Sequence, residues 1–430
     1  MKIDNKLILF LTVFIDMMGF SVIFPLFPET LKFYFNRGND PLLNFFISFL
    51  ENYFINSESP FFIVLFGGLI GSIYAVLQFI FAPVWGKLSD TFGRKIVLEF
   101  TSLGSLIGYI TWFFSGNFTS FVFSRVITGT MGGNISVASA SMADMTDSKN
   151  RAKGMGMIGA GIGLGFIFGP PLGGILSRYD LNNYFPFLNQ IGTTNYTFSA
   201  LVSVLVALIN FILIFMFFKE TLLVSNQRLR SFSHPVFGIF KSKSKNLPYI
   251  SLIYFLFTLG FSGFEFCVNF FFNEKLGFTP GEIGLSFLYM GSIVIFVQGG
   301  VVRKISGKVT EKKISLGGSI HLIIGFLILS LADSTISVFV SLFFLSFGSA
   351  LVNPGVSSLA SLNSSEEDQG LNLGILRGFG SLARVFAPLS FSVIYFTYGV
   401  KICFYTSLVI VILVFLFLLK YKEGNRSDRI

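Results

Sequence analysis

Long apolar runs that recur along the whole chain limit its possible folds more than any other feature of the sequence. A transmembrane helix needs about 20 consecutive apolar residues. We expect twelve such helices, at roughly residues 5–28, 61–84, 96–115, 119–142, 153–176, 197–218, 248–272, 282–302, 313–332, 335–356, 369–397 and 400–420. Only 12% of the 430 residues are charged, whereas soluble domains average about 25%. The sequence therefore predicts an all-α polytopic membrane protein.

Positive charge lies in alternate connections between these runs. Clusters of Lys and Arg occur at 2–6, 87–95, 149–153, 228–245, 303–313 and 420–429. Because cytoplasmic loops carry an excess of Lys and Arg, we expect a cell (inner or plasma) membrane protein with both termini cytoplasmic. This placement accounts for the net charge of +9 without nucleic acid as a partner. The apolar start is interpreted as the first helix and not as a cleaved signal, because Asp16 interrupts it and no small-residue cleavage site follows.

A polar linker divides the chain into two similar halves. We predict an N-terminal six-helix bundle at 1–221, a cytoplasmic linker at 222–247 and a C-terminal six-helix bundle at 248–430. Gly299–Lys308 follows the eighth helix as a degraded copy of Gly86–Lys95 after the second. Parallel halves related by an axis along the membrane normal are an arrangement of transporters.

The stretch Gly86–Lys95 is a charged, glycine-punctuated turn between two apolar runs. Gly86 and Gly93 permit tight backbone conformations. Asp90 and Arg94 are spaced to pair across one helical turn. The stretch is expected to act as a hinge, and an ordinary basic loop is the alternative interpretation.

Two more charged residues are expected at the same membrane face. Asp144 ends the fourth helix close to Arg151. Asp144 is placed to pair with Arg94, so we expect a charge network there and not a catalytic site.

Two charged residues lie inside predicted helices of the first half. Asp16 stands near the middle of the first helix, before Pro25 and Pro28, and Arg125 lies in the fourth. Buried acids in membranes usually face a water-filled cavity on an ion or substrate path. We expect proton coupling at Asp16, with a hydrogen-bonded structural acid as the alternative. Arg125 needs a partner from another helix, or water.

The fifth helix is dense in glycine. Small residues at three- and four-residue spacing let helix backbones approach closely. We expect helix packing at Gly165, Gly169, Pro170, Gly173 and Gly174. No strand precedes these glycines, so a nucleotide-binding loop is excluded.

The second half carries Glu265 and Asn269 in the seventh helix and Arg377 and Arg384 in the eleventh. The two arginines are two turns apart and share a helix face. Either Glu265 pairs with an arginine and holds helices together, or these residues line a cavity that attracts anions. His321 is expected to be a packed residue of the ninth helix.

Catalytic and metal chemistry has little support in the sequence. Cys267 and Cys403 lie inside predicted helices and show no metal-ligand spacing. His234 and His321 lie outside any metalloprotease motif, and G-x-S-x-G is absent. We expect no enzyme activity, no metal and no cofactor.

These residues resemble the major facilitator superfamily, and within it the tetracycline-resistance-like branch of drug/proton antiporters. Gly86–Lys95 is similar to the superfamily signature, and Arg125 with Gly129 resembles the helix-four antiporter motif. The helix-five antiporter motif resembles Gly165-x-x-x-Gly169-Pro170-Pro171-x-Gly173-Gly174. Similar to the branch are Asp16-x-x-Gly19-x5-Pro25-x-x-Pro28, Ala143-Asp144-x-Thr146-Asp147 and Glu367-x-Gln369-Gly370-x3-Gly374.

The resemblance implies two six-helix bundles around a central site that opens alternately to each side, with Asp90 and Arg94 latching the cytoplasmic face. It implies that Asp16 is the proton-linked acid and Arg125 its electrostatic modulator. Tyr74, Gln78 and Asn134 are expected in the cavity wall. Gly108 stands where the tetracycline exporters have an acid, which weighs against tetracycline itself as the substrate.

We therefore expect a secondary active transporter that exports a small amphiphilic organic compound or drug in exchange for protons. It is expected to function as a monomer in the lipid bilayer. A facilitator or symporter of an organic anion or metabolite is the alternative, motivated by Arg377 and Arg384. A membrane receptor is the alternative outside transport.

Overall fold

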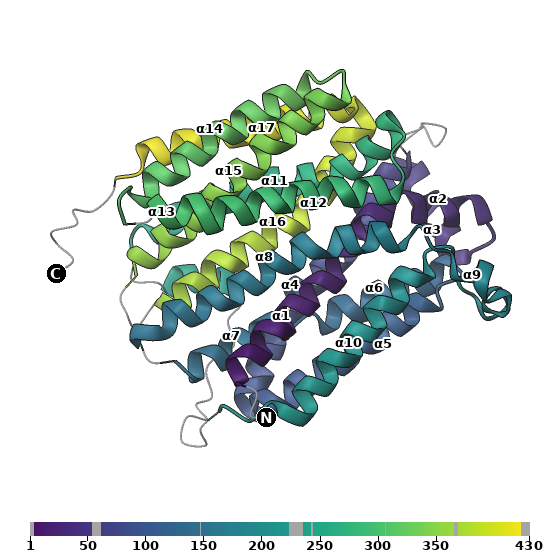
Figure 1. Cartoon of the computed structure of the whole chain (residues 1–430), viewed down its shortest axis with the longest axis horizontal. Coiled ribbons are helices and arrows are strands. Elements are labelled where there is room, and N and C mark those ends of the chain that lie inside the picture. The colour runs from purple at the N-terminus through teal and green to yellow at the C-terminus, as the bar shows by residue number, and fades with distance from the viewer. Residues whose placement is uncertain are drawn as a thin grey trace. The chain divides into compact units, whose positions relative to one another are not determined.

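The computed structural model of the chain describes residues 4–53, 62–146, 148–222, 235–241, 244–305, 307–364 and 369–422. These residues fold into helices, without strands (Figure 1). In chain order the helices are α1 (Asn5–Ser21), η1 (Phe24–Leu26), α2 (Phe27–Arg37), α3 (Pro41–Tyr53), α4 (Phe62–Phe92), α5 (Arg94–Phe113), α6 (Phe118–Met131), α7 (Asn134–Asp144), α8 (Ser148–Leu176), α9 (Leu181–Tyr184), η2 (Pro186–Ile191), α10 (Thr197–Phe217), η4 (Pro235–Lys241), α11 (Leu247–Leu276), α12 (Pro280–Phe296), η5 (Val297–Val302), α13 (Arg303–Ile305), α14 (Glu311–Ser330), α15 (Thr335–Leu362), α16 (Gln369–Tyr398) and α17 (Val400–Lys420).

Within the described residues, 11 helical segments are long and apolar enough to cross a membrane. The remaining predicted helix, 119–142, is interrupted, so that α6 and α7 are each too short to count alone. The interruption falls at Gly132 and Gly133, where the chain passes close to Gln78 and Trp85; a Cβ at Gly133 would lie 2.6 Å from that of Trp85. The prediction of an all-α polytopic membrane fold is confirmed.

The first helix was predicted to end at Pro28, and this is wrong. The regular α-helix pauses after Ser21, and the chain continues as η1 and then α2 to Arg37. Pro25 and Pro28 lie in the first turns of η1 and α2, where the missing N–H group costs no helical hydrogen bond. The prolines therefore restart the helix and do not stop it.

The connection between the first two predicted spans, residues 29–60, is helical where it is described. Asp40 organises it, because its Oδ1 accepts from the amides of Leu42 and Leu43 at 3.0 and 3.1 Å, and its Oδ2 from the Thr119 amide at 2.9 Å. One carboxylate thus caps α3 and joins it to the start of α6.

Packing divides the chain into two compact units. Unit 1 comprises Met1–His234, Phe266–Leu288 and Pro388–Thr397, and unit 2 comprises Pro235–Glu265, Tyr289–Ala387 and Tyr398–Ile430. The helices α11, α12 and α16 are therefore shared, each contributing one part to each unit. The division at 222–247, which follows chain order, stays a prediction.

In unit 1, the glycine-rich helix α8 lies directly on the backbone of α1. A Cβ at Gly165 would lie 2.5 Å from the Cβ of Met17 and 2.7 Å from the carbonyl oxygen of Phe14, and one at Gly169 would lie 2.7 Å from that of Met18. The Ser21 hydroxyl completes the contact by donating to the Gly165 carbonyl at 3.1 Å. Glycines four residues apart let the two backbones touch.

In unit 2, glycines bring the backbones of α14 and α15 into contact in the same way. A Cβ at Gly318 would lie 2.8 Å from the Gly348 carbonyl oxygen, and a Cβ at Gly348 would lie 2.7 Å from that of Gly318. Beside this contact, a buried cluster joins Val297, Ile314, Ala350 and Leu351.

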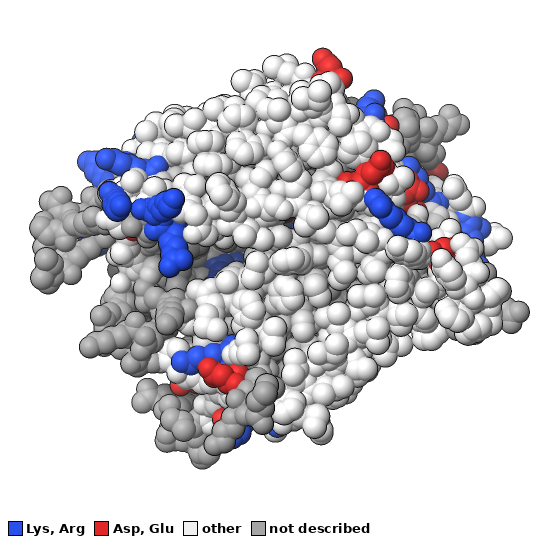
Figure 2. Space-filling model, viewed as in Figure 1, with Lys and Arg blue, Asp and Glu red and all other residues white. Residues whose placement is uncertain are grey.

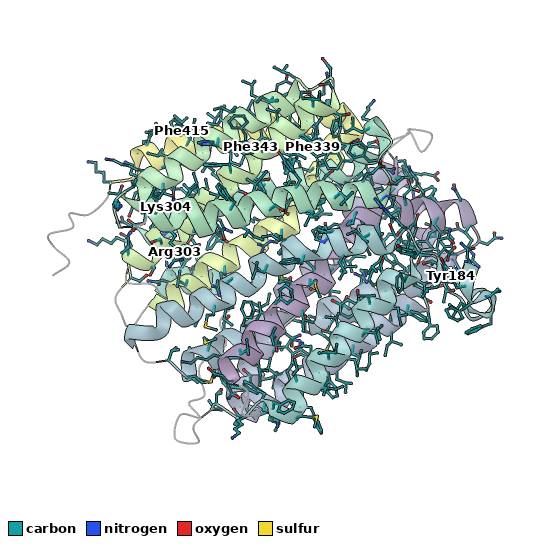
Figure 3. All side chains as sticks on the ribbon, viewed as in Figure 1. Tyr184, Arg303, Lys304, Phe339, Phe343 and Phe415 are labelled. Carbon is teal, nitrogen blue, oxygen red and sulfur yellow. The ribbon has the colours of Figure 1, made fainter. Side chains whose placement is uncertain are left out.

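The outer flanks of the helices are apolar. Figure 2 shows acidic and basic side chains near helix ends, with broad uncharged stretches between them. Figure 3 labels Phe343 on α15, which is 41% exposed, and Arg303 and Lys304 at the end of the α12–α13 segment. Exposed apolar flanks of this extent are expected of surfaces that face lipid.

The α1–α8 contact gives a test of the packing. We predict that Gly165→Leu lowers the melting temperature of the purified protein, because overpacking against backbone costs about 1–3 kcal/mol or more. Gly163→Leu is the matched control on the same helix, since a Cβ at Gly163 has nothing within 4 Å. Equal melting temperatures for the two variants would contradict the prediction.

Candidate functional site

Asp16 is buried in unit 1 with one hydrogen bond. Its side chain is 6% exposed, and its Oδ1 accepts from the Asn134 amide at 3.1 Å. Asn134 in turn accepts from the Thr101 hydroxyl at 2.6 Å. The other carboxylate oxygen, Oδ2, has no hydrogen-bond partner among the described residues. The break at Gly132 and Gly133 makes Asn134 the first residue of α7 and so leads to this contact.

Two buried tyrosines contact α1 about one turn after Asp16. Tyr74 stacks on Phe20 with ring centroids 4.4 Å apart and accepts a hydrogen bond from Gln78 at 3.2 Å. Tyr109 lies with its ring against Gly19, where a Cβ would lie 2.7 Å from Cζ. The structure therefore places Asn134 on Asp16 and Tyr74 near it on α1, with Gln78 hydrogen-bonded to Tyr74. It adds Tyr109, which sequence reasoning missed.

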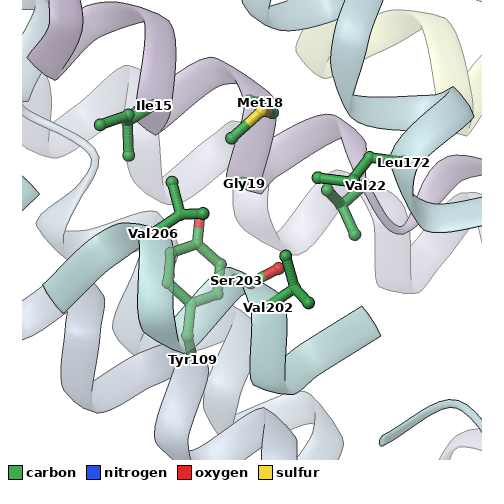
Figure 4. Close-up of a pocket in the computed structure, with 9 residues that line it drawn as sticks. All are labelled: Ile15, Met18, Gly19, Val22, Tyr109, Leu172, Val202, Ser203 and Val206. Atoms are coloured by element: carbon green, nitrogen blue, oxygen red, sulfur yellow. The ribbon is translucent and has the colours of Figure 1, made fainter. Parts of the chain in front are cut away.

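A small cavity lies beside Tyr109 (Figure 4). Its volume is about 10 Å³, which is room for no more than a single water molecule. The lining residues are Ile15, Met18, Gly19, Val22, Tyr109, Leu172, Val202, Ser203 and Val206. It is too small to hold an organic substrate.

Arg125 is buried without a carboxylate partner among the described residues. Its guanidinium lies 4.9 Å from the ring centroid of Trp112 and 5.6 Å from that of Phe121. Its Nε donates to Ser124 at 3.3 Å, while Nη2 has no hydrogen-bond partner in the described part of the chain. Trp112 belongs to α5, so the partner from another helix is an aromatic face and not an acid.

Arg94 is the centre of a charge cluster at the α4–α5 turn. Its guanidinium contacts Asp90 Oδ1 at 2.7 Å, Asp144 Oδ2 at 2.8 Å and the Ser89 hydroxyl at 2.6 Å. Asp90 lies in the last turn of α4, which ends at Phe92, and Arg94 begins α5, with Gly93 between the two helices at φ +100°. The two residues therefore meet across a tight turn and not along one helical turn, as the spacing had suggested.

Glu220 completes this cluster and was missed by sequence reasoning. It accepts from the backbone amides of Arg94 at 3.0 Å and Lys95 at 3.1 Å, so it caps α5. A Cβ at Gly93 would lie 2.6 Å from its Oε2, so only glycine leaves room. Burial opposes its ionisation, but four backbone hydrogen bonds outweigh burial and lower the pKa of Glu220. An acid directly after the sixth apolar run was the available signal.

Gly86 lies inside α4 and not at the turn. A Cβ there would lie 2.7 Å from the Ser136 hydroxyl of α7, so its role in the structure is a close helix contact. Asp147 and the side chain of Arg151 lie outside the described residues.

A second polar cluster ties α2 to the end of α11 within unit 1. Lys32 donates to Glu29 at 3.2 Å and to Asn273 at 2.5 Å, and Asn273 donates to Glu29 at 2.8 Å. This cluster lies near the start of α4, since a Cβ at Gly67 would meet Leu31 of α2 at 3.0 Å. The Arg94 cluster lies at the other end of α4, whose 31 residues span about 46 Å.

Three of the four polar residues predicted in the seventh and eleventh helices, Glu265, Arg377 and Arg384, lie in unit 2. The Arg384 guanidinium acts electrostatically on the Glu265 carboxylate, and Arg377 interacts with Tyr254. Asn269 is buried and belongs to unit 1. His321 bonds to the Gly317 carbonyl at 2.7 Å and stacks on Phe347 at 4.6 Å, as expected of a packed helix residue.

Comparison with known proteins agrees with this architecture. The profile of the Major Facilitator Superfamily matches residues 9–364 and 304–429. The chain belongs to the major facilitator superfamily. It is 31% identical to the mouse major facilitator superfamily domain-containing protein 10, over 98% of this chain and 94% of the mouse protein. It is 29% identical to the class H tetracycline resistance protein of Pasteurella multocida, over 90% and 88%.

A solved structure gives the same picture. The crystal structure of the human organic anion transporter MFSD10 (TETRAN) superposes with a TM-score of 0.76 at 28% identity, over 96% of this chain and 98% of the other. Membership in this superfamily makes the chain a multi-pass membrane transporter of small molecules and points away from an enzyme.

The Glu220 cap predicts a pH dependence of stability. Because its folded-state pKa is lowered, ionised Glu220 stabilises the fold above the ordinary Glu pKa of about 4.3, and this contribution is lost as the pH falls through the folded-state pKa. We predict that Glu220→Gln lowers the melting temperature at pH 7 and that acidification narrows the difference from the unsubstituted chain. Glu51→Gln, at an exposed position of α3, is the control. A difference that stays constant across pH would contradict the assignment.

Proposed function

We propose that the chain exports a small amphiphilic organic compound in exchange for protons, by alternating access. Asp16 is the observation that carries this proposal: a carboxylate buried among apolar and aromatic groups, held by one amide, with Oδ2 left unbonded in the described part of the chain. A charge in such a place costs several kcal/mol unless it is paired. Protonation removes that cost, so the proton state of Asp16 is coupled to its access to water.

The direction of coupling follows from this cost. A proton taken up from the outer side lets unit 1 close around a neutral Asp16, and loss of the proton inside resets the carrier. Each elementary charge that crosses the membrane contributes about 2.3 kcal/mol per 100 mV, which is enough for concentrative transport. Arg125, held over Trp112 at 4.9 Å, adds positive potential to the same interior and acts as a modulator.

Gating is assigned to the end of α4 that carries the Arg94 cluster. The Arg94 cluster of Asp90 and Asp144 latches the cytoplasmic face, where the positive-inside pattern places it. Both termini lie on that side of a cell membrane, and the carrier works as a monomer in the lipid bilayer. Gly86 and Gly93 supply the close contacts that the latch needs.

The substrate class follows from charge and from the relatives. Arg377 and Arg384 in unit 2 favour an organic anion among amphiphilic substrates, and the human relative MFSD10 is an organic anion transporter. The tetracycline resistance proteins support drug export. A facilitator or symporter for an organic anion is the second candidate, favoured by the same arginines. A receptor would leave the Asp16 arrangement without a use.

Transport by the reconstituted protein tests the proton coupling. In proteoliposomes with an imposed pH gradient, we predict that Asp16→Asn abolishes gradient-driven accumulation of fluorescein, an organic anion, and of ethidium, a cation, whichever is carried. Counterflow without a gradient is expected to persist. Asp333→Asn is the control, because that side chain is 88% exposed. Normal accumulation by Asp16→Asn would overturn the coupling role, and gradient-independent transport by the unsubstituted chain would favour the facilitator.

Turnover tests the latch. We predict that Asp90→Asn lowers the maximal transport rate roughly tenfold, the effect of about 1.4 kcal/mol, with little change in substrate affinity. Glu99→Gln is the control, since it removes the looser 3.7 Å pair with Lys95 on the same turn. An unchanged rate for Asp90→Asn would count against a gating role.

A further inference from the structure

The short 3₁₀ helix η4, before the first helix of the second half, presents two phenylalanines. Phe237 is 62% exposed and Phe240 is 85% exposed. A 3₁₀ helix has three residues per turn, so residues i and i+3 lie on one face. Phe237 and Phe240 therefore project together from a single face of η4.

An adjacent side of η4 rests on α16. Gly238 is buried, and a Cβ there would lie 3.2 Å from Ile375 Cγ1 and 3.9 Å from Leu371 Cδ1. All three residues belong to unit 2. Leu371 is itself 49% exposed, so the apolar surface of η4 continues onto a flank of a membrane-spanning helix.

The position of η4 along the chain places it at a bilayer surface. It ends at Lys241, and the span of α11 begins at Leu247. It contacts Leu371 and Ile375 in the first two turns of α16, whose span begins at Leu371. An element at the ends of two spans lies at the level of the lipid headgroups.

The segment that carries η4 has charge of one sign. No Asp or Glu occurs from Thr221 to Phe264, and Lys241, Lys243 and Lys245 follow the two phenylalanines, whereas Glu366, Glu367 and Asp368 precede α16 in the sequence. Lys245 is exposed. Each Lys near an anionic membrane adds attraction, and aromatic side chains enter the headgroup boundary.

We propose that η4 binds an anionic bilayer surface. Phe237 and Phe240 enter the boundary between headgroups and acyl chains, and Lys245 binds lipid phosphate. Because η4 rests on Leu371 and Ile375, this contact fixes the membrane depth of the helix that carries Arg377 and Arg384. This lipid contact does not depend on whether transport is coupled to protons.

Spin labelling of the full chain measures the immersion directly. Phe240→Cys is labelled selectively, because Cys267 and Cys403 are buried. In bilayers that contain phosphatidylserine, we expect the label to collide with oxygen and to be shielded from a water-soluble nickel chelate. A label at Lys308→Cys, an exposed residue of the turn before α14, is the water-accessible control.

Three other outcomes of the spin-label measurement would overturn the proposal. Accessibility to nickel equal to that of Lys308→Cys means that η4 faces water. Shielding from both reagents means that protein covers it. Equal immersion in pure phosphatidylcholine means that no anionic lipid is recognised.

Lipid retention supplies an independent measurement. Native mass spectrometry of the purified chain counts bound phosphatidylserine. We expect Lys245→Gln to weaken its binding about fivefold, and Phe237→Ser with Phe240→Ser to lose more. The matched control is Phe185→Ser with Phe187→Ser, at positions 51% and 58% exposed on the 177–196 connection. An equal loss in the control pair would overturn the assignment to η4.

Discussion

The cost of placing charge in an apolar interior is the constraint on which unit 1 depends. Among the buried charged side chains of unit 1, Arg94, Arg125 and Asp16 are stabilised in different ways. Arg94 is neutralised by Asp90 and Asp144 within 2.8 Å, and Arg125 lies over aromatic rings. Among the described residues, Asp16 is hydrogen-bonded by the Asn134 amide alone. Its charge is the least compensated of the three, which makes it the group whose protonation changes the energy of the unit most.

The position of Asp16 depends in turn on backbone contact between α1 and α8. Gly165 and Gly169 press against α1 from Phe14 to Met18, on either side of the acid in sequence. A larger side chain at either glycine would move α1, and with it the carboxylate relative to Asn134. The glycine motif and the buried acid therefore act together. The close contact of α8 with α1 holds the Asp16 carboxylate within hydrogen-bond distance of Asn134.

The sequence predicted the fold well because a membrane offers few alternatives. Apolar runs of about 20 residues must be helices, and eleven of the twelve correspond to helical segments long and apolar enough to cross a membrane in the described residues. The predicted helix boundaries were wrong where local backbone geometry determines whether a helix continues. Pro28 restarts a helix, and the Gly132 and Gly133 break is set by contacts with Gln78 and Trp85. Tyr109 and Glu220 were missed because their roles come from neighbours distant in sequence.

Charge balance in the second half bears on the two interpretations left open for Glu265. The parts of α11 and α16 in unit 2 contain three charged residues, Glu265, Arg377 and Arg384. Arg384 acts on Glu265 electrostatically, whereas Asp16, in the first helix of the other half, has no salt bridge among the described residues. One acid against two arginines leaves a net charge of +1 on these helices. The two interpretations are therefore compatible. Arg384 can pair with Glu265 and hold the helices together, and the remaining positive charge can attract an anion to the cavity wall.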